Sequence, residues 1–264
     1  MARDNAAPQP IPVAGVRADA GTIRLTTRDI RALLWLADMY AAQGDTLARL
    51  LDTSTDVVRQ LHARWRRGGY VETGRLGPGP VWCWLTRHGL DACDLPYTAK
   101  QPPLGRLRHL RAVATVRLTV ESWTPYHEAG AHWRSERRLR WQLGAGVGRR
   151  GHVPDAEIHW PDTTGQPTDQ PGAQFAGEIW CVEVELTPKT VTRTTAILRE
   201  MLARTGDYGD PPRHGGAPAA PRYARILYLT TPAARPTVDA ARTQLPQAAA
   251  ARVDIRPLPD GTAL

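Results

Sequence analysis

Hydrophobic residues recur at helical spacing in the first third of the chain, and they predict three helices. The first follows a variant capping box at Thr26–Asp29, the second covers 46–51, and the third runs from about 55 to 67. Two apolar runs, at 70–73 and 81–85, then predict strands joined by a loop rich in Gly and Pro. The outward side of the third helix and the loop carry basic and polar residues: Arg59, Gln60, Arg64, Arg67 and Arg75.

Beyond residue 106, helical and strand patterns alternate. Helices are predicted at 107–123, 188–204 and 236–245, and strands at 156–160, 178–186, 224–230 and 253–257. The closing strand-helix-strand run favours a parallel pair of strands. We therefore expect an α/β fold (α+β overall) with a flexible tail at 1–24, a first domain at 25–94, a linker at 95–105 and a second domain at 106–264.

The most informative alternation lies in the strand predicted at 178–186. Trp180, Val182, Val184 and Leu186 face one side of it, and Ile179, Cys181, Glu183 and Glu185 face the other. Thr187 is a suitable N-cap for the next helix, and Pro188 suits its first position, which places Lys189 in the first turn. Two carboxylates and one ammonium are therefore expected near the end of this strand.

Asp155 ends a Pro-Asp dipeptide directly before the strand predicted at 156–160. If the two strands pair, Asp155 joins Glu183, Glu185 and Lys189. Carboxylates bind Mg²⁺ or Mn²⁺ through oxygen, and such a metal neutralises a phosphodiester and activates water. We expect Asp155 and Glu183 to be the metal ligands, with Glu185 or Lys189 positioning water or charge. The alternative is structural, because a strand ending in Glu-x-Glu is often a solvated face and Pro-Asp is a common turn dipeptide.

The charge balance favours an anionic partner. The 264-residue chain has a net charge of +8 and a pI near 9.9, so double-stranded DNA is the first candidate partner. Residues 26–100 nevertheless hold ten Lys or Arg against eight Asp or Glu, a net charge of only +2. Solvated arginines, or a surface for protein contacts, remain alternatives for this part, and a homodimer remains open.

Several function classes are not expected. The three cysteines, Cys83, Cys93 and Cys181, are too few and too scattered for a disulfide framework or a Cys-x-x-Cys zinc site. No apolar run approaches membrane-spanning length, and residues 1–20 contain no apolar signal segment, so a cytoplasmic protein without a membrane partner is expected. The eight histidines are interpreted as ordinary surface or core residues, although His159 shares the strand face of Asp155.

The residues described above resemble two known structural families. Three helices followed by a hairpin resemble the winged helix-turn-helix domains, which implies that the third helix enters the major groove of DNA and that Arg75 lies on the wing. The Pro-Asp and Glu-x-Glu motifs resemble the PD-(D/E)xK nucleases, which implies a central mixed sheet and Mg²⁺ held by Asp155 and Glu183. The sequence departs from that pattern at Glu185, where the family has Lys, and Lys189 is the candidate replacement cation.

The resemblance extends to further residues. Glu136 matches the additional acidic residue that many PD-(D/E)xK nucleases carry, with a surface carboxylate as its alternative. Arg193, one helical turn after Lys189, is a further candidate DNA-binding residue. As a whole, residues 25–257 are similar to the replication-relaxation proteins of mobile elements. The shared motifs start at Leu25, Trp133, Val153 and Val182. This similarity implies a role in plasmid replication or DNA processing.

Three hypotheses follow from the sequence. The first is a Mg²⁺-dependent DNA endonuclease or nickase targeted by a winged helix. The second is a non-catalytic DNA-binding replication or transcription factor with an inactive nuclease-like scaffold, which Glu185 in place of Lys favours. The third is a protein-interaction adaptor without a role on nucleic acid.

Overall fold

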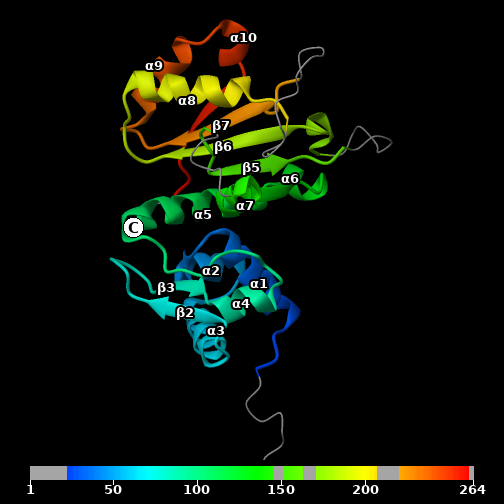
Figure 1. Cartoon of the computed structure of the whole chain (residues 1–264), viewed down its shortest axis with the longest axis vertical. Helices are drawn as coiled ribbons and strands as arrows, with labels where there is room; N and C mark the ends of the chain where they lie inside the picture. Colours follow the sequence, from blue (N-terminus) through cyan, green and yellow to red (C-terminus); the bar gives the residue numbers. More distant parts are fainter. Residues whose placement is uncertain (1–22, 145–150, 163–170, 207–219, 262–264) are drawn as a thin grey trace, which may run out of the picture.

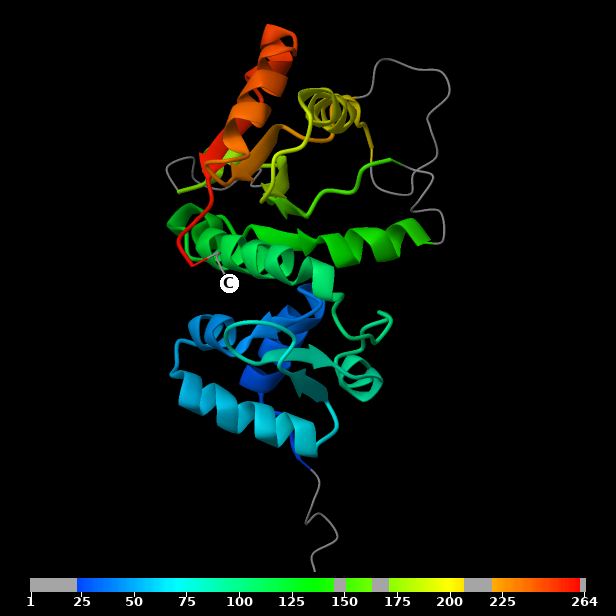
Figure 2. The same ribbon diagram turned by 90° about the vertical axis from the view of Figure 1, so that its left-hand side faces the viewer.

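The computed structural model describes residues 23–144, 151–162, 171–206 and 220–261, and within them the protein is mixed α/β (Figures 1 and 2). The N-terminal part contains α1 (Thr27–Asp38), β1 (Ala42–Gln43), α2 (Gly44–Leu50), α3 (Thr55–Arg67), β2 (Val71–Gly74), β3 (Trp82–Leu85) and α4 (Arg87–Ala92). The three short strands form an antiparallel sheet in the order β1-β3-β2. The three predicted helices and the two predicted strands are therefore confirmed, and β1 is an addition.

The second part of the chain is built on a five-stranded mixed sheet. Its elements are a 3₁₀ turn (Leu104–Arg106), α5 (Leu107–Glu121), α6 (Thr124–Glu128), β4 (His132–Ser135), α7 (Glu136–Leu143), β5 (Ala156–His159), a 3₁₀ turn (Ala173–Phe175), β6 (Ile179–Glu185), α8 (Val191–Ala203), β7 (Arg225–Thr230), α9 (Arg235–Thr243), α10 (Gln247–Ala250) and β8 (Val253–Pro257). The strand order is β4-β5-β6-β7-β8. The β4–β5 and β5–β6 pairs are antiparallel, whereas the β6–β7 and β7–β8 pairs are parallel. The parallel pair expected at the end of the chain is thus confirmed.

One edge strand was missed, and one helix start was predicted wrongly. The edge strand β4 was not predicted, because its four residues are too short for a clear alternation. The helix after β6 begins at Val191 with Thr190 as its N-cap, three residues later than predicted from Thr187 and Pro188. The Thr190 hydroxyl accepts a hydrogen bond from the Arg193 backbone N–H at 3.2 Å. Lys189 consequently lies in the loop before α8.

The helices cover both faces of the large sheet. In Figure 1, α8 and α9 lie on one face, and α5 lies on the other face, between the sheet and the N-terminal part. The alternation of β6 divides its side chains between these layers as predicted. Trp180, Val182 and Val184 join the core beneath α5, whereas Cys181 packs with α8 and α9. Among the described residues, no helix has the length and apolar content needed to cross a membrane.

The N-terminal part and the second part share one continuous hydrophobic core. That core includes Tyr97, which lies inside the segment predicted as a linker and is buried. The buried Arg137 of α7 crosses the junction and donates hydrogen bonds to the carbonyls of Ala37 at 2.6 Å and Thr98 at 2.7 Å. Its guanidinium lies 5.0 Å from the ring of Tyr40 and 4.7 Å from the ring of Tyr97. The two parts are therefore held in a defined relative orientation.

Candidate functional site

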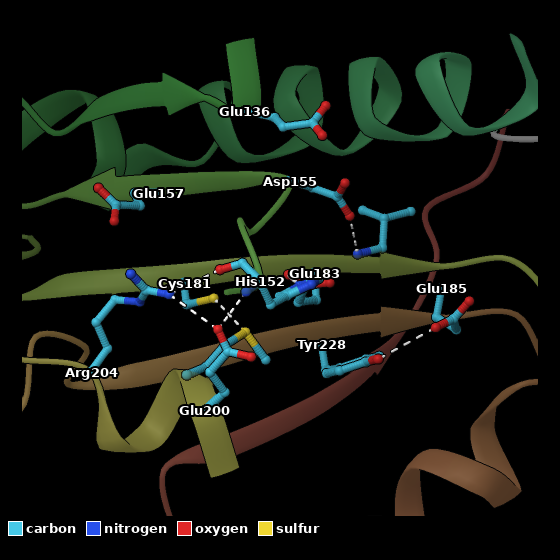
Figure 3. A network of polar contacts seen from close by, with 12 residues as sticks. Glu136, His152, Asp155, Glu157, Cys181, Glu183, Glu185, Glu200, Arg204 and Tyr228 are labelled. Atoms are coloured by element: carbon cyan, nitrogen blue, oxygen red, sulfur yellow. Dashed lines mark hydrogen bonds and ion pairs between the residues drawn. The ribbon is translucent and has the colours of Figure 1, made fainter. Parts of the chain in front are cut away.

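Asp155, directly before β5, and Glu183, on β6, are opposite each other in the register of the two strands; we refer to them as the facing pair. Ala156 on β5 pairs with Val182 on β6, so the next antiparallel step sets Asp155 opposite Glu183. The carboxylate of Asp155 also accepts a hydrogen bond from the backbone N–H of Val184 at 2.8 Å (Figure 3). The pairing of the two motif strands, on which the predicted site depends, is confirmed.

Each of these carboxylates contacts a histidine that the sequence analysis interpreted as an ordinary residue. His109 Nε2, on α5, lies 2.7 Å from Asp155 Oδ1, and His152 Nε2 lies 2.6 Å from Glu183 Oε1. His152 precedes Asp155 by only three residues, which is a signal that could have been used. His109 is 46 positions away from Asp155, and only the packing of α5 on the sheet brings it there.

A second set of contacts fixes His152 beside Glu183. Glu200 of α8 accepts a hydrogen bond from the His152 backbone N–H, and Arg204 donates one to the His152 carbonyl at 3.0 Å (Figure 3). Gly151 passes so close to the Glu200 carboxylate that a side chain there would collide with it, and its φ of +88° also favours glycine. The segment entering β5 is thereby bound to α8.

Burial and mutual charge give Glu183 an unusual protonation equilibrium. Burial raises the pKa of Glu183 to about 7, and the negative charge of Asp155 adds to this, against the opposing hydrogen bond from His152. Burial also opposes ionisation of Asp155, but the charge of His109 and the Val184 N–H outweigh it and lower the pKa of that carboxyl. Burial would lower the pKa of His152, yet its contact with Glu183 dominates and raises it. Asp155 is thus held ionised, whereas the Glu183 carboxyl is partly protonated near neutral pH.

Glu185 and Lys189 pair with each other. The Lys189 ammonium donates to Glu185 Oε2, and the hydroxyl of Tyr228 lies 3.4 Å from the same oxygen. Glu185 is on the same face of β6 as Glu183, as predicted, and Figure 3 shows it beyond Glu183 along the strand. In this arrangement the ammonium neutralises Glu185, and no contact joins it to Asp155.

Glu136 is buried at the start of α7, so its alternative interpretation as a surface carboxylate is wrong. Its two oxygens accept hydrogen bonds from Arg106 Nη2 at 2.7 Å and from Arg140 Nε at 2.7 Å. Its backbone N–H donates to the carbonyl of Asp155 at 2.9 Å. The side chain is therefore near Asp155 but is held by two guanidinium groups.

The carboxylates suit a hard divalent cation in chemistry and in number. Within the described ranges, no group of three or more His, Cys, Asp or Glu side chains is arranged to hold a metal ion. Mg²⁺ typically uses one or two protein carboxylates and completes its shell with waters and substrate phosphates. The facing pair of Asp155 and Glu183 fits that requirement.

The N-terminal part presents a second candidate surface on the outer side of α3. Arg59, Gln60 and Arg67 are exposed there, and the exposed Arg75 lies in the loop between β2 and β3. Gln60 and Arg67 line an open surface recess of about 530 Å³ together with Ala63 and Arg66, the latter a basic residue that the sequence analysis did not single out.

Arg64 does not face outward as predicted. Its guanidinium turns toward the body of the protein and pairs with the fully buried Asp29 of α1, 35 positions earlier in the chain. Arg193 is exposed on the first turn of α8.

The unfolding free energy, measured as a function of pH, should reveal the ionisation of the buried Glu183 carboxyl. A group whose folded pKa is raised stabilises the fold below its unfolded pKa and loses that contribution as the pH rises through the folded pKa. For Glu183 this window runs from about pH 4.5 to pH 7, and the raised pKa of His152 extends the decline upward. Wild type should therefore lose stability between pH 5 and pH 8, whereas Glu183→Gln lacks this ionisation. We expect the unfolding free energy of the variant, relative to that of wild type, to rise by about 1–3 kcal/mol over this range, as measured by urea titration in EDTA. A difference that stays constant over this range would show that Glu183 ionises normally.

No protein-family model matches this chain, and neither the curated proteins nor the solved structures contain a significant match.

Proposed function

We propose that this protein binds double-stranded DNA through α3 and the β2–β3 loop, and that it nicks or cleaves DNA in a reaction that depends on Mg²⁺ or Mn²⁺. The observation that carries the proposal is the facing pair, in which Asp155 is opposite the buried Glu183 in the strand register. The biological setting that we infer is plasmid or mobile-element replication, or another form of DNA processing.

The electrostatics of the pair support a cation-binding role. The pKa of Glu183 is raised first by burial and further by the negative charge of Asp155, so ionising both carboxylates carries a cost. A divalent cation would relieve it, and perturbed carboxylates of this kind concentrate at functional sites.

Each residue of the site would have a separate role in the reaction. Asp155 and Glu183 would hold the cation, which would neutralise the phosphodiester and lower the pKa of a bound water. His109 and the Val184 N–H hold Asp155 ionised and fix its orientation. Lys189 lies at the same end of β6, where its ammonium would have to exchange Glu185 for a phosphate that approaches the site. Glu183 is buried, which limits the water that can compete for the cation at its carboxylate.

The N-terminal part supports DNA binding by its element order and its exposed charges. Three helices followed by an antiparallel hairpin, with a further short strand between the first two helices, correspond to the order of a winged helix-turn-helix domain. In such a domain α3 would lie in the major groove, with Arg59, Gln60 and Arg67 facing the DNA. Arg66 lines the same recess and joins them, whereas Arg64 serves to anchor α3 on α1.

A second candidate function is supported by the contacts of the same carboxylates. Asp155 and Glu183 are both engaged by imidazoles, and Lys189 is bound to Glu185. A nuclease-like scaffold that has lost its activity would accumulate such internal partners. The second candidate is therefore a non-catalytic DNA-binding replication or transcription factor.

The test is relaxation of supercoiled plasmid by the purified protein in Mg²⁺, Mn²⁺ or EDTA, together with gel-shift binding to linear duplex. Nicked or linear product with Mg²⁺ or Mn²⁺, and none with EDTA, is the expected result. A DNA shift without any product in either cation would favour the non-catalytic candidate. Failure to bind duplex DNA at low salt would reject both and leave a protein-interaction adaptor.

A further inference from the structure

We infer that α3 reads base pairs directly, and that Gln60 is the residue that selects an adenine in the bound DNA. This inference rests on the proposed function, which places α3 in the major groove, and it adds a base preference that the sequence did not indicate. Gln60 lies in the middle of α3, on the exposed side of the helix.

The inner side of α3 is fixed, and this defines the positions of its outer residues. Val58, Leu61 and Trp65 are buried in the hydrophobic core. Trp65 Nε1 also donates a hydrogen bond to Asp29 Oδ1 at 3.0 Å, and Arg64 pairs with the same carboxylate. These contacts oppose rotation of α3 about its own axis. An outer residue therefore keeps one position on the surface, as the reading of a base edge requires.

The charge on the outer side of α3 is unevenly distributed along the helix. Arg66 and Arg67 are exposed in the last turn, and no hydrogen bond or ion pair among the described residues involves either side chain. In the first turns, Arg59 Nη2 lies 3.0 Å from Asp56 Oδ1, with the two side chains 77% and 71% exposed. This pair cancels its own charge, so the attraction to phosphates is concentrated at the C-terminal end of α3.

Between these two regions α3 presents neutral groups. The Gln60 carboxamide has no hydrogen-bond partner in the described parts of the chain, and Ala63, one helical turn later, is exposed as well. Both residues line the open recess of about 530 Å³, which leaves them accessible to a ligand. A neutral amide gains less from a phosphate than a guanidinium does, but it can donate and accept hydrogen bonds at the same time. This part of α3 therefore suits base edges.

The hydrogen-bonding groups of Gln60 correspond to those of adenine. In the major groove adenine presents an acceptor, N7, beside a donor, its N6 amino group. The side-chain NH₂ of glutamine can donate to N7 while the side-chain carbonyl accepts from N6. Guanine presents two acceptors there, O6 and N7, and leaves the glutamine carbonyl without a donor. The Ala63 methyl group suits apolar contact with the methyl group of a neighbouring thymine.

The experiment is the selection of binding sites from a pool of duplexes with a random central segment, carried out in EDTA, where cleavage is not expected. Wild type should enrich a motif with a fixed A·T pair and should bind it at least about fivefold more tightly than the same duplex with G·C at that position. Gln60→Ala should lose this preference but retain the slope of log K against log salt, because no charged contact is removed. The variant should remain folded, since Gln60 is exposed and Ala is the strongest helix former.

A second variant should exchange the preference. Gln60→Glu replaces the carboxamide by a carboxylate, which only accepts hydrogen bonds, and cytosine offers the N4 amino donor. This variant should therefore lose the adenine from its selected motif and enrich cytosine. A purely structural role for Gln60 would not produce such an exchange.

Two controls separate base reading from general DNA binding. Gln247→Ala changes an exposed glutamine on α10, in the second part of the protein, and should leave both the motif and the salt slope unchanged. Arg67→Gln should weaken binding to all sequences by a similar factor and reduce the slope by about 0.9, the value of one lost phosphate contact.

Two results would overturn the inference. The first is an unchanged motif for Gln60→Ala. The second is wild-type protein that binds all duplexes equally well with a steep salt dependence, in which case Gln60 is a solvated side chain and the proposed function still stands. If wild type shows no salt-dependent binding to any duplex, the proposed function and this inference both fail.

Discussion

Protein carrying Asp155→Asn and Glu183→Gln is expected to lose DNA nicking by at least about a hundredfold while it retains its affinity for duplex DNA. The reason is that the two substitutions remove the ligand charges for a divalent cation, whose charge neutralisation and water activation contribute several kcal/mol to such a reaction. Shape and most hydrogen-bonding capacity are preserved, because Asn can still accept from the Val184 N–H and Gln can still bond to His152. The quantities to compare are the initial nicking rate in Mg²⁺ and the gel-shift midpoint.

A matched control makes this comparison specific. Asp254→Asn with Glu178→Gln changes the same two residue types on β8 and just before β6, away from the facing pair. This control should nick at close to the wild-type rate. Equal nicking by the site variant and the control would mean that the carboxylate pair has no part in the reaction, and a loss of DNA binding in the site variant would point to misfolding.

Asp29→Ala is expected to destabilise the protein by about 2–4 kcal/mol, because it removes both a helix cap and a buried hydrogen-bond partner. Asp29 accepts hydrogen bonds from the Thr26 backbone N–H at 2.7 Å and from Trp65 Nε1 at 3.0 Å, and it pairs with Arg64. Trp65 is completely buried, so its indole N–H would lose its partner where water cannot replace it.

The same substitution should affect function through α3. Asp29 connects the start of α1 to two residues of α3, and its loss would loosen the helix that we propose to lie on DNA. Chemical denaturation of Asp29→Ala, Asp29→Asn and wild type is the measurement, with Asn expected to recover part of the loss because it can still cap α1. A destabilisation below about 0.5 kcal/mol for Asp29→Ala, typical of an ordinary surface change, would contradict the structural role.

Much of the fold could be predicted because its signals are local. The capping sequence before α1, the helical spacing of the apolar residues and the alternation along β6 each depend on residues a few positions apart. The same is true of the Pro-Asp and Glu-x-Glu motifs, which is why the sequence indicated both Asp155 and Glu183. The strand pairing that joins them was a conditional expectation, and the structure confirms it.

Local signals also explain the errors. Thr187 and Thr190 are both acceptable N-caps, and Pro188 favours Thr187 when only local signals are considered. In the structure, Thr231 donates hydrogen bonds to the carbonyls of Glu185 and Leu186, which holds this segment extended and delays the helix. Thr231 lies 45 positions after Leu186, so no local sequence pattern could indicate this contact.

The sequence by itself therefore determined most of the helices, although not α6, α7 and α10, together with most of the strands and the carboxylates of the facing pair. Only the tertiary structure decided which partners those residues have. It brought His109 to Asp155, turned Arg64 inward to Asp29, and set Arg106 beside Glu136 across 30 positions. The physical reason is that backbone propensity and amphipathic spacing act over one or two turns, whereas the partner of a buried charge is selected by the packing of distant elements and by the cost of leaving that charge uncompensated.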